Sequence, residues 1–143
     1  MTELYEKILV DHAKRPRHFG PLPRATHAAE GSNPLCGDEL TVRLRIDGER
    51  IGEIAFEGAG CAVCIGSASL MSSAVRGLTL RDVTDVVRQI RALLRGEGNP
   101  ASMGDLAALG GVSRFPARIK CAALAWSALE AALAGAPSVS TEL

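Results

Sequence analysis

The sequence has few aromatic residues, no net charge and no long hydrophobic run. Phe, Trp and Tyr make up 3% of the 143 residues, which leaves few rings on which nucleic-acid bases could stack. Lys and Arg together number 16, and so do Asp and Glu, so that no net field attracts nucleic acid or an anionic membrane. We therefore expect neither nucleic acid nor membrane among the partners of this protein.

The sequence also lacks apolar segments that could cross a membrane or direct secretion. Gly, Ser or charged residues interrupt each apolar run before it reaches ~20 residues. The N-terminal stretch MTELYEKILVDHAKRP mixes charges into a helical pattern and has no apolar leader core. We expect a cytoplasmic protein, whose four cysteines are reduced and act as metal ligands, nucleophiles or buried residues rather than in disulfides.

Alternating apolar residues predict a small antiparallel sheet. Leu40, Val42, Leu44 and Ile46 alternate with polar residues, and the Asp47-Gly48 turn predicts a hairpin whose return strand covers residues 51–56. A short edge strand is expected at residues 25–30, which gives about three strands with one face covered.

Helical periodicity predicts the elements that cover this face. Capping and breaking residues place four helices at about residues 2–14, 62–76, 79–96 and 116–134. We expect an α+β fold with helices packed on one face of the sheet. Residues 1–135 form a single domain in this interpretation, and residues 136–143 a flexible tail.

Three cysteines lie at positions where a thiol could do chemistry. Cys36 sits in the polar turn NPLCGDEL, Cys61 in a Gly-rich turn that enters a helix, and Cys121 in the first turns of the last helix. Helix N-termini favour thiolates, which are the nucleophilic and metal-binding form. A small buried hydrophobe remains an alternative for Cys121, and a backbone-bonding turn residue for Asp38.

Cys61 and Cys64 are spaced C-x-x-C, which is typical of a redox pair, of half a zinc site or of two core residues. A thioredoxin-type pair follows a strand in a βαβ unit, whereas an antiparallel hairpin precedes this one. A zinc half-site needs a second such pair, and the other cysteines are single. We predict that Cys64 is a small buried residue. His12 is expected to be a helix-face residue.

Four segments resemble, in order, the IscU/SufU/NifU-N family of iron–sulfur cluster assembly proteins: DHAKRPRHFG, NPLCGDEL, FEGAGCAVCIGSAS and FPARIKCAALAW. The resemblance implies the SufU/IscU-like fold. It also implies that Cys36, Asp38, Cys61 and Cys121 converge on one metal or cluster site, in which Arg118 could offset negative charge.

Two departures favour the SufU branch of this family. IscU scaffolds carry His directly before the third cysteine, where this chain has Lys120, and Leu-Pro-Pro-Val-Lys where it has FPARIK. The extra segment between Gly77 and Ser113 also resembles SufU. The resemblance implies a zinc-bound sulfur acceptor that takes persulfide sulfur onto Cys36 from a SufS-like cysteine desulfurase.

Two other functions remain open at this point. In one, the chain is an IscU-like scaffold on which the cysteines hold a [2Fe–2S] cluster for transfer to apoproteins. In the other, it is a zinc-stabilised binding module without catalysis. If the chain is instead the sulfur acceptor, the recipient of its sulfur is a downstream cluster scaffold or an apoprotein.

Overall fold

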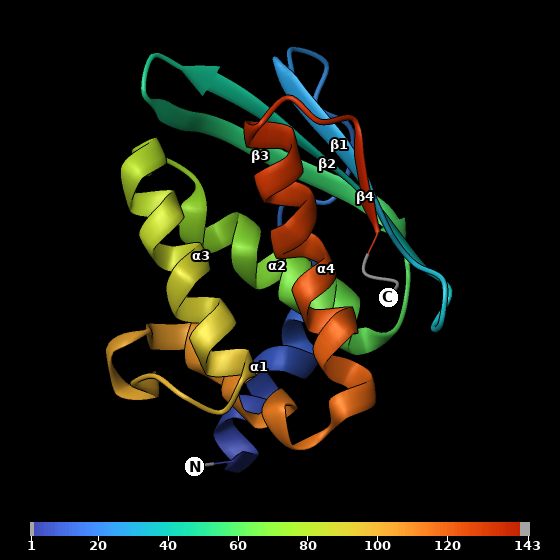
Figure 1. The fold of residues 1–143 in the computed structure, drawn as a ribbon, viewed down its shortest axis with the longest axis vertical. Helices are drawn as coiled ribbons and strands as arrows, with labels where there is room; N and C mark the ends of the chain where they lie inside the picture. The colour runs from blue at the N-terminus through green and yellow to red at the C-terminus, as the bar shows by residue number, and fades with distance from the viewer. Residues whose placement is uncertain (1, 141–143) are drawn as a thin grey trace.

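A computed structural model describes residues 2–140 of the protein (Figure 1). Two 3-10 segments, Pro100–Ser102 and Gly104–Arg114, lie between the last two α-helices. The helices and strands follow one another as α1 (Thr2–Lys14), β1 (His27–Asn33), β2 (Asp38–Asp47), β3 (Arg50–Ala59), α2 (Ala62–Val75), α3 (Leu80–Leu94), α4 (Pro116–Leu133) and β4 (Ser138–Ser140).

The sheet has four strands in the order β3-β2-β1-β4. The predicted antiparallel hairpin of β2 and β3 is confirmed, and β1 pairs antiparallel with β2. β4 adds a fourth strand, parallel to β1, so β1 is not the edge strand that the sequence indicated, and the sheet has four strands instead of about three. Ser138–Ser140 is too short to show an alternating pattern, and its pairing depends on β1 being in place. Residues 141–143 of the predicted tail lie outside the described residues.

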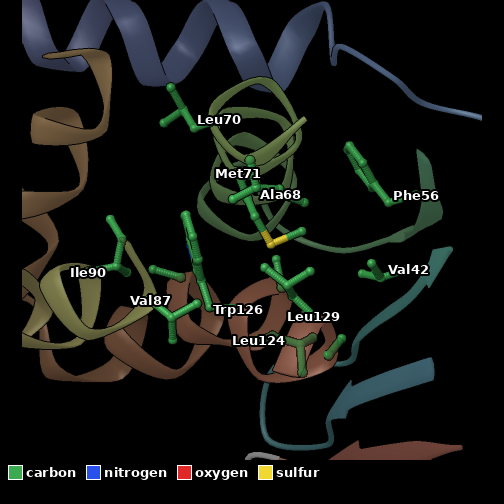
Figure 2. Close-up of a cluster of buried hydrophobic side chains, with 14 of the residues drawn as sticks. Val42, Phe56, Ala68, Leu70, Met71, Val87, Ile90, Leu124, Trp126 and Leu129 are labelled. Carbon is green, nitrogen blue, oxygen red and sulfur yellow. The ribbon is translucent and has the colours of Figure 1, made fainter. Parts of the chain in front are cut away.

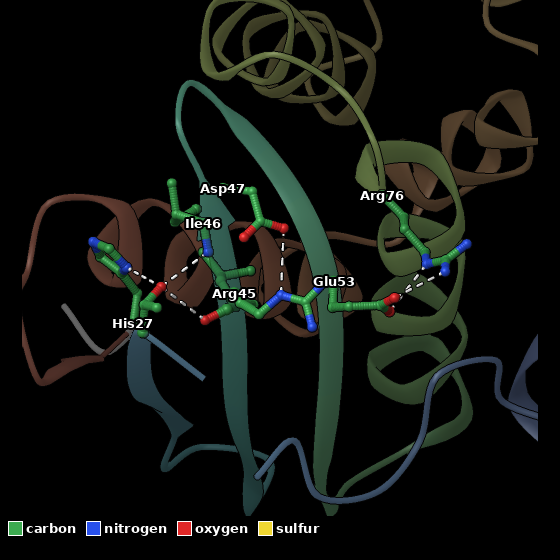
Figure 3. Close-up of polar contacts among 8 residues, drawn as sticks. His27, Arg45, Ile46, Asp47, Glu53 and Arg76 are labelled. Atoms are coloured by element: carbon green, nitrogen blue, oxygen red, sulfur yellow. Dashed lines mark hydrogen bonds and ion pairs between the residues drawn. The ribbon is translucent and has the colours of Figure 1, made fainter. Parts of the chain in front are cut away.

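The helices cover one face of this sheet, as predicted (Figure 1). Leu40, Val42 and Leu44 of β2 are buried beneath them. The opposite face carries charged side chains (Figure 3). There Arg45 pairs with Asp47, and Glu53 of β3 pairs with Arg76 at the end of α2. The sheet therefore has one apolar and one polar face, which fixes its register against the helices.

Helix α2 is the centre of the core, packed between α1 and α4. Its side chains are small or apolar on all sides, which is typical of a buried helix. Figure 2 shows Met71 of α2 in the same cluster as Trp126 and Leu129 of α4, with side chains from the sheet closing the other side. Trp126 Nε1 donates to Ser67 Oγ at 3.0 Å, and Ser67 Oγ donates to the Ala122 carbonyl at 2.7 Å. These bonds fix α2 against α4.

His12 lies on the face of α1 that packs against α2, where its side chain is buried. His12 Nδ1 is hydrogen-bonded to Ser69 Oγ at 2.7 Å, and His18 Nδ1 is hydrogen-bonded to Ser72 Oγ at 2.9 Å. Burial is the main cause that lowers the pKa of both imidazoles below the usual range. The N-terminal helix and the loop after it are thus attached to α2.

The described residues 2–140 include no helix with both the length and the apolar character that a membrane crossing requires.

Candidate metal centre

Three segments that are distant in the sequence meet at one end of the sheet: the β1–β2 turn, the start of α2 and the start of α4 (Figure 1). Asn33 and Asp38 are paired in register where β1 ends and β2 begins. The turn between them presents Cys36, and Gly37 closes it with a φ of 72°, in the left-handed region that glycine adopts readily.

Cys36, Asp38 and Cys121 form one compact group. A sulfur from each cysteine and a carboxylate oxygen of Asp38 all lie within 4.8 Å of one another. Asp38 and Cys121 are fully buried, whereas Cys36 is exposed. Thiolates and carboxylates are ligands that suit Zn²⁺. One candidate ligand, Cys36, is therefore exposed to solvent, while Asp38 and Cys121 are buried in the protein.

The Asp38 carboxylate is held from both sides. The backbone N–H of Cys61 donates to Oδ1 at 2.9 Å, and Nδ2 of Asn33 donates to Oδ2 at 3.3 Å. The sequence predicts a polar turn around Cys36. The residues of this turn are polar, but the side chains of Asn33 and Asp38 are buried. A buried carboxylate needs such partners because the interior disfavours an unpaired charge.

Cys61 lies at the border of the group rather than within it. It is the N-cap residue of α2 and is half-buried, and it lies close enough to Cys121 to contribute to the raised pKa of that thiol. The structure thus brings together three of the four predicted ligands and places the fourth beside Cys121. Coordination by Cys61 stays a prediction.

The electrostatics of the group fit a bound cation. Burial, followed by hydrogen bonding to Asp38, Cys36 and Cys61, raises the pKa of the Cys121 thiol. The Arg118 guanidinium lies beside Cys121, and this proximity raises the pKa of Arg118. A buried thiol beside a buried carboxylate ionises only where positive charge is close. A divalent ion would supply that charge, so the residues present fit a metal site.

Cys64 lies one turn further into α2 and is fully buried. Its sulfur is 3.1 Å from the position that a Cβ on Gly60 would occupy. Burial, with the nearby charge of Asp38 as the next cause, raises the pKa of this thiol and keeps it protonated. The structure places Cys64 among buried residues, where the sequence analysis put it, and outside the group of three donors.

Sequence reasoning did not identify Asn33 as part of the site. In β1 the inward positions are Ala29, Gly31 and Asn33, because strand residues alternate between faces. This alternation in β1 could have indicated that Asn33 points inward. It was overlooked because Asn33 directly precedes Pro34, and an Asn-Pro pair is typical of the start of a turn.

The NifU-like N terminal domain family matches residues 4–138 of the chain. The chain belongs to this family. The zinc-dependent sulfurtransferase SufU of Bacillus subtilis is 37% identical over 136 residues, which cover 94% of this chain and 92% of the relative. The iron–sulfur cluster assembly scaffold protein IscU of Streptococcus pyogenes is also 37% identical, over 93% of this chain and 84% of the relative.

A solved structure supports the same assignment. The crystal structure of a putative iron–sulfur cluster assembly scaffold protein of the SUF system from Fervidobacterium islandicum aligns with a TM-score of 0.85 and 30% identity, over 92% of this chain and 97% of that one. The predicted family and the predicted α+β fold are confirmed. Overall identity does not separate SufU from IscU, so the function has to be argued from the site.

Proposed function

We propose that the protein is a zinc-dependent sulfur acceptor of the SufU type in iron–sulfur cluster assembly. Cys36 receives persulfide sulfur from a SufS-like cysteine desulfurase. The observation that carries this proposal is the exposed thiol of Cys36 beside the buried donors Asp38 and Cys121. Cys36, Asp38, Cys61 and Cys121 would hold the zinc ion, which when bound keeps thiols ionised without redox chemistry of its own.

The exposure of each thiol supports Cys36 as the acceptor. Cys64 and Cys121 are fully buried, and Cys61 is half-buried at the start of α2. Cys36 precedes Gly37, whose φ of 72° and open surroundings leave this turn free of side-chain crowding. A persulfide carried on a partner enzyme can therefore reach Cys36 without displacement of a helix.

The transfer itself is a thiolate exchange. The Cys36 thiolate attacks the terminal sulfur of the desulfurase persulfide, and a new S–S bond forms at Cys36. The S–S bond on the desulfurase breaks, and its cysteine leaves as a thiolate. No electrons enter or leave the pair of proteins. Cys36 then carries the sulfur to a cluster scaffold or an apoprotein in the cytoplasm.

A second candidate function is that of a cluster scaffold, which the 37% identity to the Streptococcus pyogenes IscU supports. Cys36, Cys61 and Cys121 would then bind the iron of a [2Fe–2S] cluster as cargo. Metal analysis of the purified protein separates the two functions. We expect one zinc per chain, and iron with acid-labile sulfide would favour the scaffold.

An assay of desulfurase turnover tests the proposal directly. The parent protein should stimulate alanine release by a SufS-like desulfurase in the absence of small-molecule reductant, and Cys36→Ser should abolish the stimulation. Cys64→Ser is the matched control and should retain most of it. If the purified protein contains zinc but neither the parent nor the control stimulates any desulfurase of this type, the protein is a zinc-stabilised module. A persulfide found by mass spectrometry on Cys121 of the parent would overturn the assignment of Cys36.

A further inference from the structure

Asn33 is a polar residue at a buried position of the sheet. It is fully buried at the end of β1, on the inward face shared with Ala29 and Gly31. Its Oδ1 has no hydrogen-bond partner, and no other buried side-chain nitrogen or oxygen within residues 2–140 shares this condition. An unsatisfied buried acceptor is unfavourable for folding. The residue is therefore not explained by stability.

The other end of the same amide contacts two of the proposed ligands at once. Nδ2 of Asn33 donates to Asp38 Oδ2 at 3.3 Å and to Cys121 Sγ at 3.5 Å. A carboxylate can only accept hydrogen bonds, so the NH₂ group of Asn33, and not its amide oxygen, must face Asp38. Asn33 thus links the start of β2 to the start of α4 through two of the proposed metal ligands.

We propose that Asn33 is a positioning residue of the metal centre, which holds Asp38 and Cys121 in the orientation that zinc requires. This inference rests on the centre described under Proposed function. Residues behind metal ligands fix the orientation of the donor atoms, and their loss weakens metal binding even though they do not touch the ion. Asp38 has a second support in the Cys61 N–H, whereas Asn33 is the contact that couples it to Cys121.

The test compares zinc affinity with the stability of the zinc-free chain. Asn33→Leu removes both N–H donors together with the unsatisfied oxygen, and Asn33→Ala does so without added volume. We expect either variant to lose about 10- to 100-fold in zinc affinity by chelator competition. The melting temperature of zinc-free Asn33→Leu should stay close to that of the parent, because the loss of the donor to Asp38 Oδ2 is offset by removal of the unsatisfied Oδ1. Co²⁺-loaded variants should show altered visible absorption bands, because the ligand geometry changes.

Ser69→Ala is the matched control. Ser69 is also a fully buried polar residue, but its hydroxyl is hydrogen-bonded to His12 and to the Arg17 backbone, away from the cysteines. This variant should lower the melting temperature and leave the zinc affinity of the folded protein unchanged.

A double-mutant cycle tests whether Asn33 acts on zinc affinity through Asp38. In an Asp38→Ala background, Asn33→Leu should cost less zinc affinity than it does in the parent, because one of its two partners is already gone. Zinc affinity of both Asn33 variants within twofold of the parent would overturn the inference and leave the proposed function standing. Loss of affinity that only follows a loss of zinc-free stability would overturn it too. A parent chain that binds no zinc would overturn the centre itself.

Discussion

The backbone N–H of Cys61 donates a 2.9 Å hydrogen bond to Oδ1 of Asp38, and this bond joins the start of α2 to the start of β2. Cys61 is the N-cap of α2, where the free N–H groups and the helix dipole favour a negative partner. Asp38 is therefore positioned by the helix that follows Cys61 as well as by its own strand. A change in either residue should affect the other.

Asp38→Ala removes a buried oxygen donor and leaves the Cys61 N–H and the Asn33 amide without their acceptor. Loss of a residue behind a ligand already costs about 10- to 100-fold in metal affinity. We expect loss of the ligand itself to cost at least as much, measured by zinc competition with a chelator. Unaltered affinity would show that Asp38 does not bind the ion.

Cys61 and Cys64 should respond differently to substitution by Ser. Cys61 borders the donor group, whereas Cys64 is fully buried with a raised pKa and lies outside it. Cys61→Ser should lose zinc and lower the melting temperature, and Cys64→Ser should keep zinc and most acceptor activity. Zinc content of the two purified variants is the measurement. Equal loss in both would mean that the C-x-x-C acts as a unit.

Gly60→Ala should damage the site by crowding. A Cβ on Gly60 would lie 2.7 Å from Asp38 Oδ1 and 3.1 Å from Cys64 Sγ. Overpacking of this kind costs about 1–3 kcal/mol in unfolding free energy, and here it displaces the carboxylate of Asp38, a proposed ligand. We expect lower stability in urea and weaker zinc binding. Gly111→Ala is the control, because nothing lies within 4 Å of the added methyl, and it should change neither quantity.

The stability of the zinc-free protein should fall as the pH drops below about 6.5, the pKa of an unperturbed histidine. Burial and the charge of Arg17 lower the pKa of His12 in the folded state, despite opposing effects of Asp11 and Asp105. The unfolded chain then binds the proton first, so this contribution is complete above the unfolded pKa and is lost as the pH falls through the folded one.

Melting temperatures measured with a chelator present between pH 7.5 and pH 5 test this dependence. His12→Asn should flatten it in part, because His18 is shifted in the same direction and continues to contribute. An unchanged slope in the variant would show that the pKa of His12 does not differ between the folded and the unfolded state.

The features of the fold that the sequence predicts are those that depend on neighbouring residues in the chain. The alternation of Leu40, Val42 and Leu44 predicts the buried face of β2, and Thr79 predicts the start of α3, where its hydroxyl accepts the Asp82 N–H. The family motifs predict the residues of the site. Of these, the structure groups Cys36, Asp38 and Cys121.

The contacts that the sequence does not predict connect distant residues. His12 is buried because Ser69 meets it from α2, 57 positions away in the chain. Asn33 belongs to the site because α4 brings Cys121 to it from 88 positions away. Neither partner can be read from the residues next to His12 or Asn33, since both depend on how helices pack on a finished sheet.

The short strand β4 also covers the edge of β1 against pairing with another copy of the chain. Beside β1 it uses backbone groups that would otherwise be free, and Glu30 N–H donates to the Pro137 carbonyl at 2.9 Å. An open strand edge is a template on which a second chain can add and start aggregation. With β4 in place, β1 is no longer an edge strand, and within residues 2–140 the edges of the sheet are β3 and the three-residue β4. Removal of residues 136–143 would uncover the edge of the strand that ends at Asn33.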